Sequence, residues 1–456
     1  MIKTHSLIVM IILIITSTLQ ADDKLQRSAF LGLAPTNPGP GGEVIVQNLF
    51  PSGTAQALAI QTGDKLISVN GQKITDFPSL IPVLRNIYED SDISVEVIRA
   101  GETLTLAAKA QGRPKETGDG FSVEYSQFNW QENRIRTITY TPDQPRSDGA
   151  AVMYIQGYTC GSIDYGMVPD LTLNQLLATY AKAGFKVMKM EKPSVGDSEG
   201  QLDCMQIDFS TENMAFLAGL KHFKTHEGVN EDNVFIFGHS LGVLHAAFIA
   251  EKGLAKGVMG YGGVVKPWND YMRDIFTKQA VKYFGTTKAQ ATENMKSIGP
   301  FLKDWLETDK PWSDVLKTEH AKAVQSANLI AMNGDLIMDR HYSFFRDTSR
   351  FDFRKLWAGS KSHVLMMHGT YDIQTVESGW QHEIAQIVND QQRVSAKALT
   401  FERTEHALMQ YPDLQSLLSA MENRSNNAGN PGEKYNPDIA KASLKWMQGI
   451  LSDHSR

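Results

Sequence analysis

The most constraining feature of the sequence is a Gly-x-Ser-x-Gly pattern that stands between an apolar run and a helical one. Residues 234–237 are typical of a buried strand, and residues 243–251 are typical of a helix. The glycines of the pattern, Gly238 and Gly242, allow a tight turn that joins the strand directly to the helix. We therefore expect the hydroxyl of Ser240 to stand clear of a sheet, at the N-terminus of a helix.

A serine hydroxyl needs a base before it becomes a good nucleophile. His406 follows a predicted strand at 396–401 and is the candidate base. Its imidazole needs a carboxylate on the other nitrogen to fix the tautomer and stabilise the cation. Asp372 ends a predicted strand with a His-Gly-x-x-Asp turn and is the candidate acid. The rival acids, none of which ends a strand with this turn, are Asp335, Glu377, Glu402 and Glu405.

Apolar runs alternate with helical stretches through the C-terminal three quarters of the chain. After an antiparallel pair at 122–130 and 134–140, the pattern predicts buried strands at 150–155, 185–190, 234–237, 257–261, 363–367 and 396–401. Buried strands that alternate with helices predict an α/β fold, with a mostly parallel sheet covered on both faces.

The chain order Ser240, Asp372, His406, together with this alternation, resembles the α/β-hydrolase fold over residues 121–455. The resemblance implies a doubly wound sheet on which Ser240 is the nucleophile, His406 the base and Asp372 the residue that orients the base. It also implies a helical lid, which we place in the insertion at about 263–353. The large apolar side chains of the insertion either line an acyl or aryl pocket or form its own core, and they include Trp268, Tyr271, Met272, Phe276, Tyr283, Phe284, Trp305 and Trp312.

Two backbone N–H donors are needed for a tetrahedral oxyanion. Leu241, directly after the nucleophile, is the first candidate. By resemblance to the family, the second is Tyr158, in the loop after the strand at 150–155. That loop begins Gln156-Gly157, whereas the family usually has His-Gly, so the hydrogen bonding of this loop differs from the family pattern.

A second serine stands in a Gly-Asp-Ser-Glu-Gly segment at 196–200. This segment resembles the nucleophile segment of chymotrypsin-like proteases, but that fold is all-β and carries its His and Asp upstream of the serine. We therefore expect Ser198 to lie in a glycine-rich turn rather than to act as a nucleophile.

Short β-rich runs separated by turn residues fill residues 27–112, among them a run at 44–46 and an alternating strand at 93–98, with a predicted helix at 79–87. Four ordered motifs there resemble a PDZ domain of the bacterial secreted-protease type: Phe30-Leu31-Gly32-Leu33, Pro51-Ser52-Gly53-Thr54-Ala55, Gly63-Asp64-Lys65-Leu66-Ile67 and Val69-Asn70-Gly71. The resemblance implies that Leu31, Gly32 and Leu33 offer backbone N–H groups to the C-terminal carboxylate of a peptide or protein. The alternative is a closed groove with a packing role. Residues 113–120 are polar, rich in turn residues, and predicted to form a linker.

The N-terminus has the pattern of a secretory signal peptide over residues 1–21. Lys3 precedes an apolar run at 7–15, and Ala21 precedes two acidic residues. An uncleaved membrane anchor is the alternative, although the run is short for a membrane span. A cleaved signal peptide predicts that the mature protein is periplasmic or secreted and has no membrane span. In such an oxidising compartment Cys160 and Cys204 either pair or remain two buried thiols.

Composition excludes several classes of protein. Lys and Arg number 45 against 51 Asp and Glu, which gives a net charge of −6. The chain therefore lacks the excess of basic residues that is typical of nucleic-acid-binding proteins. Two cysteines exclude a disulfide-rich scaffold and a four-cysteine zinc site. The sequence contains no phosphate-binding glycine loop, dinucleotide fingerprint or His-Glu-x-x-His pattern, so we predict no cofactor and no metal.

The sequence thus predicts an exported serine hydrolase that cleaves a carboxylic ester through an acyl-enzyme. Peptide hydrolysis and acyl transfer use the same acyl-enzyme and remain open, and a PDZ-like domain favours a peptidase among them. A binding or scaffold protein on a hydrolase fold is the alternative from another class.

Overall fold

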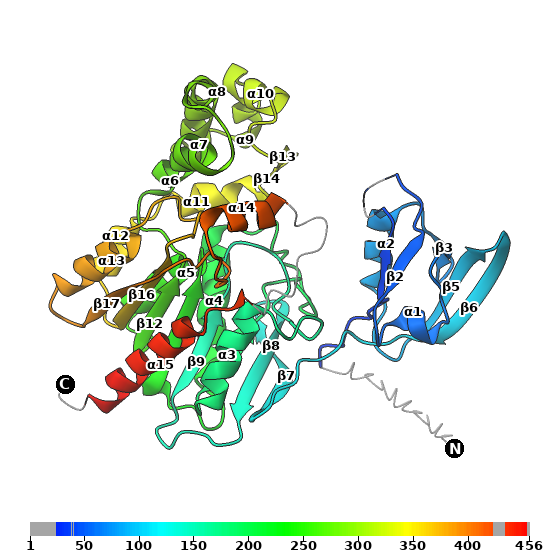
Figure 1. Ribbon diagram of the computed structural model, residues 1–456, viewed down its shortest axis with the longest axis horizontal. Helices are drawn as coiled ribbons and strands as arrows, with labels where there is room; N and C mark the ends of the chain where they lie inside the picture. Colours follow the sequence, from blue (N-terminus) through cyan, green and yellow to red (C-terminus); the bar gives the residue numbers. More distant parts are fainter. Residues whose placement is uncertain (1–23, 38, 40, 423–433, 454–456) are drawn as a thin grey trace, which may run out of the picture.

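The computed structural model describes residues 24–37, 39, 41–422 and 434–453. The predicted signal peptide, residues 1–21, lies outside the described residues. Figure 1 shows a small N-terminal unit beside a larger α/β unit. No helix within the described residues is both long enough and apolar enough to cross a bilayer.

The N-terminal unit is built from two small antiparallel sheets and two helices. Strands pair in the orders β1-β2 and β4-β3-β5-β6. The elements are β1 Leu33–Pro35, β2 Val46–Leu49, α1 Thr54–Ala57, β3 Lys65–Val69, β4 Gln72–Lys73, α2 Phe77–Leu84, β5 Asp92–Arg99 and β6 Glu102–Lys109. In β5, Ile93, Val95 and Val97 point inward and are fully or almost fully buried, as the alternation in sequence predicts.

Three features of this unit differ from the sequence prediction. The run at 44–46 enters a strand only at Val46, and Ile45 makes an isolated bridge to Lys65. The predicted helix at 79–87 begins at Phe77, because Asp76 caps it by accepting a hydrogen bond from the Ser79 N–H at 2.9 Å, and it ends at Leu84. The edge strand β6 was not predicted.

The larger unit contains one eight-stranded sheet in the order β17-β16-β12-β11-β9-β10-β8-β7. Strands β7 and β8 are antiparallel to their neighbours and the other six run parallel. The strands are β7 Phe121–Trp130, β8 Asn133–Pro142, β9 Ala151–Ile155, β10 Lys186–Met190, β11 Val234–His239, β12 Gly257–Tyr261, β16 His363–Gly369 and β17 Ala396–Phe401. This order, with the predicted strands in their predicted places, is that of the α/β-hydrolase fold, and the expected fold class is confirmed.

Both faces of this sheet are buried under helices. In β9, Met153 and Ile155 pack on one face while Val152 and Tyr154 pack on the other. The first face is covered by α4 Phe209–Phe223, α5 Gly242–Lys252 and α13 Trp380–Asn389, and the second by α3 Thr172–Lys182 and α15 Pro437–Ser452.

The insertion that follows β12 and ends before α12 Phe353–Ala358 forms a helical layer over one end of the sheet (Figure 1). It comprises α6 Trp268–Asp274, the π-helix η2 Ile275–Gln279, α7 Ala280–Tyr283, α8 Lys288–Leu306, α9 Trp312–Val315, α10 Glu319–Ser326, the short strands β13 Met332–Asn333, β14 Leu336–Ile337 and β15 Arg340–His341, and α11 Tyr342–Thr348. Trp305 and Trp312 are buried in its core, whereas Phe284 is 53% exposed.

The predicted linker has no helix or strand, but it packs against the larger unit. Glu116 is buried and forms an ion pair of 2.7 Å with Lys189 on β10, and both side chains are 1% exposed. Glu116 also accepts hydrogen bonds from Tyr140 and from the Tyr165 N–H. These contacts fix the middle of the linker against the large sheet.

Replacing the linker carboxylate is expected to destabilise the larger unit. Glu116→Ala leaves the Lys189 ammonium buried without its partner, a loss of about 3–5 kcal/mol in the free energy of unfolding. Urea unfolding followed by tryptophan fluorescence measures this loss. The control is Asp119→Ala, which removes an exposed carboxylate from the same segment and is expected to cost about 1 kcal/mol or less. Equal effects of the two substitutions would contradict the structural role of Glu116.

Candidate active site

The turn between β11 and α5 holds Ser240 in a conformation that few serines adopt. Its φ is +58°, in the left-handed region that costs energy for a residue with a side chain. The Ser240 N–H donates to the Tyr261 carbonyl at 2.8 Å, which fixes the turn against β12. A Cβ at Gly242 would lie 2.3 Å from the Ile155 carbonyl oxygen, so the turn requires glycine there.

His406 and Asp372 are brought together from the loops after β17 and β16. The His406 Nδ1–H donates to Asp372 Oδ2 at 2.9 Å and lies 3.0 Å from Oδ1. The Asp372 carboxylate is fully buried and also accepts a hydrogen bond from the Gln374 N–H at 3.0 Å. With Nδ1 engaged in this way, Nε2 of His406 is the basic nitrogen.

The pKa values of the two groups move in opposite directions. Burial alone would raise the pKa of Asp372, but the facing His406 ring outweighs burial and lowers this pKa. Burial alone would lower the pKa of His406, and the Asp372 carboxylate outweighs it, so that this pKa is raised. The pair therefore favours an ionised carboxylate beside an imidazole that binds protons more tightly than usual.

Ser240 and His406 line one cavity of about 530 Å³. No hydrogen bond joins the two side chains in the part of the chain that the structure describes. Contacts of this kind often tighten only when a substrate is in place. The structure thus gives the His406–Asp372 bond and a shared cavity, while the bond between Ser240 and His406 stays a prediction.

The loop after β9 lies directly against Ser240. A Cβ at Gly157 would be 3.0 Å from the Ser240 Cβ, so only glycine allows this approach. Tyr158 and Leu241 both line the cavity, and within the described residues neither of their N–H groups donates a hydrogen bond. Both predicted oxyanion donors are therefore free to bind a ligand oxygen.

Gln156, at the position where the family pattern has His, holds this loop in place through hydrogen bonds. Its Nε2 donates to the Gly161 carbonyl at 2.7 Å and to the Thr159 carbonyl at 3.2 Å. The side-chain amide thereby holds the loop folded back on itself beside the cavity.

A cluster of buried charges beneath the loop was not predicted from the sequence. Lys192 donates to the Gly157 carbonyl at 2.6 Å, and Arg340 donates to the Tyr158 carbonyl at 2.5 Å. Glu212 forms an ion pair with each of them, at 3.0 Å from Lys192 and 2.8 Å from Arg340. Burial lowers the pKa of Lys192 to about 8, and the Glu212 carboxylate keeps it from falling further. No local signal indicated the cluster, because Glu212 stands in the first turn of α4, where an acidic side chain ordinarily stabilises the helix N-terminus from the surface.

The other histidines near Ser240 have structural partners. His239 donates from Nε2 to the His406 carbonyl at 2.8 Å, and burial lowers its pKa to about 4, so it remains neutral at pH 7. His245 is buried and hydrogen-bonds Glu212 at 3.1 Å. His368 accepts a hydrogen bond from the Trp380 indole N–H at 3.2 Å.

None of the rival acids hydrogen-bonds His406 within the described residues. Glu377 pairs with Lys266 and Lys278 at the surface, and Glu405 accepts a hydrogen bond from the Met409 N–H at 3.1 Å. The second candidate serine, Ser198, accepts from the Arg136 N–H at 2.9 Å and does not line the cavity of Ser240.

The cavity is lined mainly by aromatic and aliphatic side chains, and no Asp, Glu, Lys or Arg is among the described residues that line it. The large side chains come from both the sheet loops and the insertion: Tyr154, Tyr158, Tyr165, Leu171, Leu173, Leu244, Trp268, Tyr271, Met272, Ile275, Met338 and Phe345. Its shape and polarity suit an uncharged, partly aromatic or aliphatic group.

The insertion is attached to both sides of the site. On one side Arg340, 1% exposed, is bonded to Tyr158 in the loop after β9. On the other side the Tyr271 hydroxyl donates to the Gln374 carbonyl at 2.7 Å, and Gln279 donates to the Ile373 carbonyl at 2.8 Å, next to Asp372.

Cys160 and Cys204 form a disulfide. The bond joins the loop after β9 to the segment that follows β10, 44 residues later. Of the two alternatives that the sequence left open, the structure therefore contains the paired one.

Comparison with known proteins assigns the N-terminal unit. Residues 24–110 match the PDZ domain family. The regulator of sigma-E protease RseP of Escherichia coli (strain K12) is 26% identical over 103 residues, which are 23% of this chain and 22% of that protein. The match thus spans about a fifth of the length of that curated relative.

Solved structures similar to the chain include hydrolases. Est1E from Butyrivibrio proteoclasticus is 12% identical with a TM-score of 0.41, over 72% of this chain and 99% of that one. Acylaminoacyl peptidase from Pyrococcus horikoshii is 10% identical with a TM-score of 0.45, over 80% and 55%. Proline iminopeptidase from Mycobacterium smegmatis is 11% identical with a TM-score of 0.42, over 72% and 98%. The assignment of the fold rests on the strand order given above.

The reactivity of Ser240 is expected to depend on pH through His406. Because its pKa is raised, the imidazole becomes neutral only above the ordinary histidine value of about 6.5. The rate at which a fluorophosphonate labels Ser240 should therefore rise with pH, with a midpoint above that value. In Asp372→Asn the rate should fall at least about a hundredfold and the midpoint should move down. A pH-independent rate would contradict the assignment of His406 as base.

Removing the ammonium beneath the loop is expected to slow the same reaction. Lys192→Met deletes the donor to the Gly157 carbonyl, so the loop that carries the Tyr158 N–H is held less firmly. We expect labelling of Ser240 to slow by about tenfold to a hundredfold, less than the loss of about a hundredfold to a thousandfold found when an oxyanion donor is removed outright. Lys221→Met, the same change at an exposed position of α4, is the control and should leave the rate unchanged. An unaffected rate in Lys192→Met would show that the loop does not need this support.

Proposed function

We propose that this chain, in which a PDZ domain precedes an α/β-hydrolase fold, is an exported serine hydrolase that cleaves carboxylic esters. The observation that carries the proposal is the His406–Asp372 pair, which lies beside the strained turn of Ser240 in a single uncharged cavity. Two free N–H groups, of Tyr158 and Leu241, line the same cavity.

The proposed reaction passes through an acyl-enzyme. Nε2 of His406 takes the proton of Ser240 as its Oγ attacks the ester carbonyl, and the oxyanion accepts from the Tyr158 and Leu241 N–H groups. His406 then gives the proton to the departing alkoxide, which leaves as an alcohol. Water, deprotonated by the same nitrogen, attacks the acyl group and releases the carboxylic acid with the Ser240 hydroxyl restored. Asp372 stabilises the imidazolium in both steps.

The lining of the cavity favours an ester over a peptide. A bound peptide brings backbone N–H and C=O groups that need partners once they leave water. Aromatic and aliphatic side chains dominate the lining, and they suit an acyl or aryl group better than a polypeptide. The PDZ domain is the observation that favours a peptidase, because such a domain can hold a polypeptide close to the hydrolase unit.

The proposal includes export to the periplasm or the medium. It is supported by the signal-peptide pattern in the sequence and by the disulfide between Cys160 and Cys204, since disulfides persist in oxidising compartments. The partners proposed are a small ester and, at Leu31, Gly32 and Leu33, a peptide or protein C-terminus.

A fluorophosphonate probe tests the nucleophile. The mature wild-type protein should be labelled, and Ser240→Ala and His406→Ala should not be. Ser198→Ala is the matched control, because it removes the serine of the other Gly-x-Ser-x-Gly segment, and it should be labelled like the wild type. A folded wild type that resists the probe would favour a binding protein over an enzyme.

The substrate class is then read from paired chromogenic substrates. We expect kcat/KM for a 4-nitrophenyl butyrate ester to exceed that for neutral peptide 4-nitroanilides by at least about a hundredfold, a difference of roughly 2.7 kcal/mol in the activation free energy. Faster cleavage of the anilides would replace the esterase by the peptidase.

A further inference from the structure

A second cavity, of about 610 Å³, lies between the PDZ domain and the hydrolase domain. Residues 28–33 and one side of α2 form its first wall. Its second wall belongs to the hydrolase domain: the loop at 194–200, with Cys160 and Ser162 behind it. We call this cavity the shared groove.

The first wall is suited to an extended polypeptide. Among the described strands β1 pairs only with β2, so its other edge is open. Within the described residues the N–H groups of Leu31 and Gly32 donate no hydrogen bond. An open strand edge next to free N–H groups binds a chain that ends in a carboxylate.

Side chains along the groove indicate the chemistry of its occupant. Leu80, Ile81 and Leu84 of α2 line it, and Ile81 is 40% exposed although it is a large apolar residue. Arg85 and Arg113 also line it and supply positive charge. An apolar last residue with a free carboxylate complements both features.

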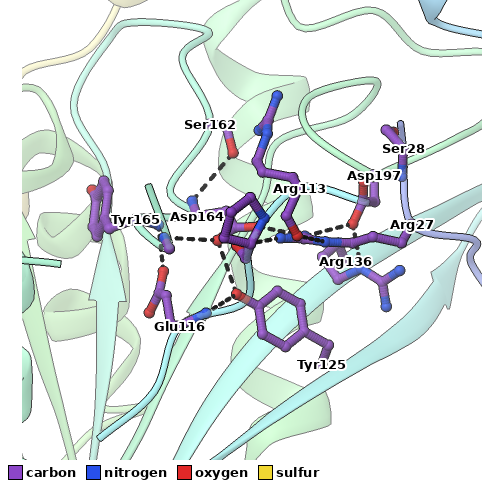
Figure 2. Close-up of polar contacts among 12 residues, drawn as sticks. Arg27, Ser28, Arg113, Glu116, Tyr125, Arg136, Ser162, Asp164, Tyr165 and Asp197 are labelled. Atoms are coloured by element: carbon purple, nitrogen blue, oxygen red, sulfur yellow. Dashed lines mark hydrogen bonds and ion pairs between the residues drawn. The ribbon is translucent and has the colours of Figure 1, made fainter. Parts of the chain in front are cut away.

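Asp197 fixes the second wall to the first. Its carboxylate accepts from the Ser28 N–H at 3.0 Å and pairs with the Arg27 guanidinium at 3.0 Å (Figure 2). Arg27, whose side chain is 6% exposed, also pairs with Asp164 in the loop after β9. Burial would raise the pKa of Asp197, but the Ser28 N–H and Arg27 outweigh burial and lower it. The carboxylate is therefore ionised and bonded to the PDZ domain at pH 7.

A second contact crosses between the domains at Tyr88. Its hydroxyl hydrogen-bonds Glu199, and burial together with this carboxylate raises the pKa of Tyr88. Glu199 is held in turn by Arg134 on β8. The loop at 194–200 is thus attached to the PDZ domain through two of its residues, and the groove between them still measures about 610 Å³. The alternative interpretation of the sequence, a closed groove with a packing role, does not fit a cavity of this volume.

We propose that a polypeptide C-terminus with an apolar last residue binds in the shared groove and contacts the hydrolase loop at 194–200 as well as the PDZ domain. This inference rests on the proposed binding of a C-terminus at Leu31, Gly32 and Leu33, and adds that the PDZ domain alone is only half of the site. The hydrolase domain then contributes to both affinity and selection of the ligand, apart from any chemistry at Ser240.

Hydrogen exchange with mass spectrometry on the full mature chain tests the proposal. The probes are fluorescein-labelled octapeptides with a free C-terminal Val, Leu or Phe, each compared with its C-terminal amide. Fluorescence polarisation first identifies the peptide that binds. With that peptide present, amides at 194–204 of the hydrolase domain should exchange at least about threefold more slowly, as should those at 28–33 and in α2. The amidated peptide should protect neither region.

Variants of the second wall test its contribution to affinity. Asp197→Asn removes the charge that binds Arg27 and should weaken peptide binding by about tenfold, although no PDZ residue has changed. Asp119→Asn, the same change at an exposed linker position outside the groove, should bind like the wild type. If Asp197→Asn fails to fold, Glu199→Gln, which keeps the shape of a partly exposed side chain, takes its place and should weaken binding severalfold.

The outcomes separate this inference from the proposed function. Protection in both domains and weaker binding by the loop variants support it. Protection confined to residues 24–112, with unchanged affinity in the variants, overturns the shared groove and leaves a simple PDZ–peptide interaction. No binding of any free-carboxylate peptide overturns both. Labelling of Ser240 by fluorophosphonate is measured independently, so loss of the esterase proposal alters none of these readings.

Discussion

One buried carboxylate, that of Glu212, connects most of the parts that make up the candidate site. It is fully buried and bonded to Lys192, Arg340 and His245, which lie after β10, in the insertion and on α5. One carboxylate thus faces two buried cations, and removing it would leave both without a counter-charge in a medium of low dielectric constant, which is costly. The position of the loop beside Ser240 therefore depends on the ion pairs beneath it, because Lys192 and Arg340 also donate to the Gly157 and Tyr158 carbonyls.

The same principle recurs where the two domains meet. Arg27, Asp164 and Asp197 form one buried cluster (Figure 2). Glu116 and Lys189 form a second buried pair. Tyr125 joins them, because its hydroxyl donates to Asp164 and accepts from the Glu116 N–H. Apolar packing tolerates small shifts between surfaces, whereas buried charges demand partners at fixed positions. Buried ion pairs thus attach the PDZ domain to the hydrolase domain.

The fold and the main residues of the site could be predicted because their signals are local. A parallel strand such as β12 is a continuous apolar run, and the Gly-x-Ser-x-Gly turn carries its own glycines. The partnership of Glu212 with Arg340 spans 128 residues, and nothing near either residue indicates the other. Asp197 and Glu116 stand in segments rich in turn residues, where a carboxylate ordinarily faces water. The edge strand β6 was missed although its Thr103-Leu104-Thr105-Leu106 run alternates, and in the structure none of its residues is fully buried.

The attachment of the insertion to both sides of the site has a consequence for catalysis. Arg340 links it to the loop that carries Tyr158, and Tyr271 and Gln279 link it to the turn that carries Asp372. A substrate too bulky for the cavity must push against this roof. The displacement would pass to the loop that carries Tyr158 on one side and to the turn that carries Asp372 on the other. Substrates too large for the cavity should therefore bind but react slowly, so that discrimination lies in the rate of reaction. An insertion that was not attached to the site would discriminate through binding affinity instead.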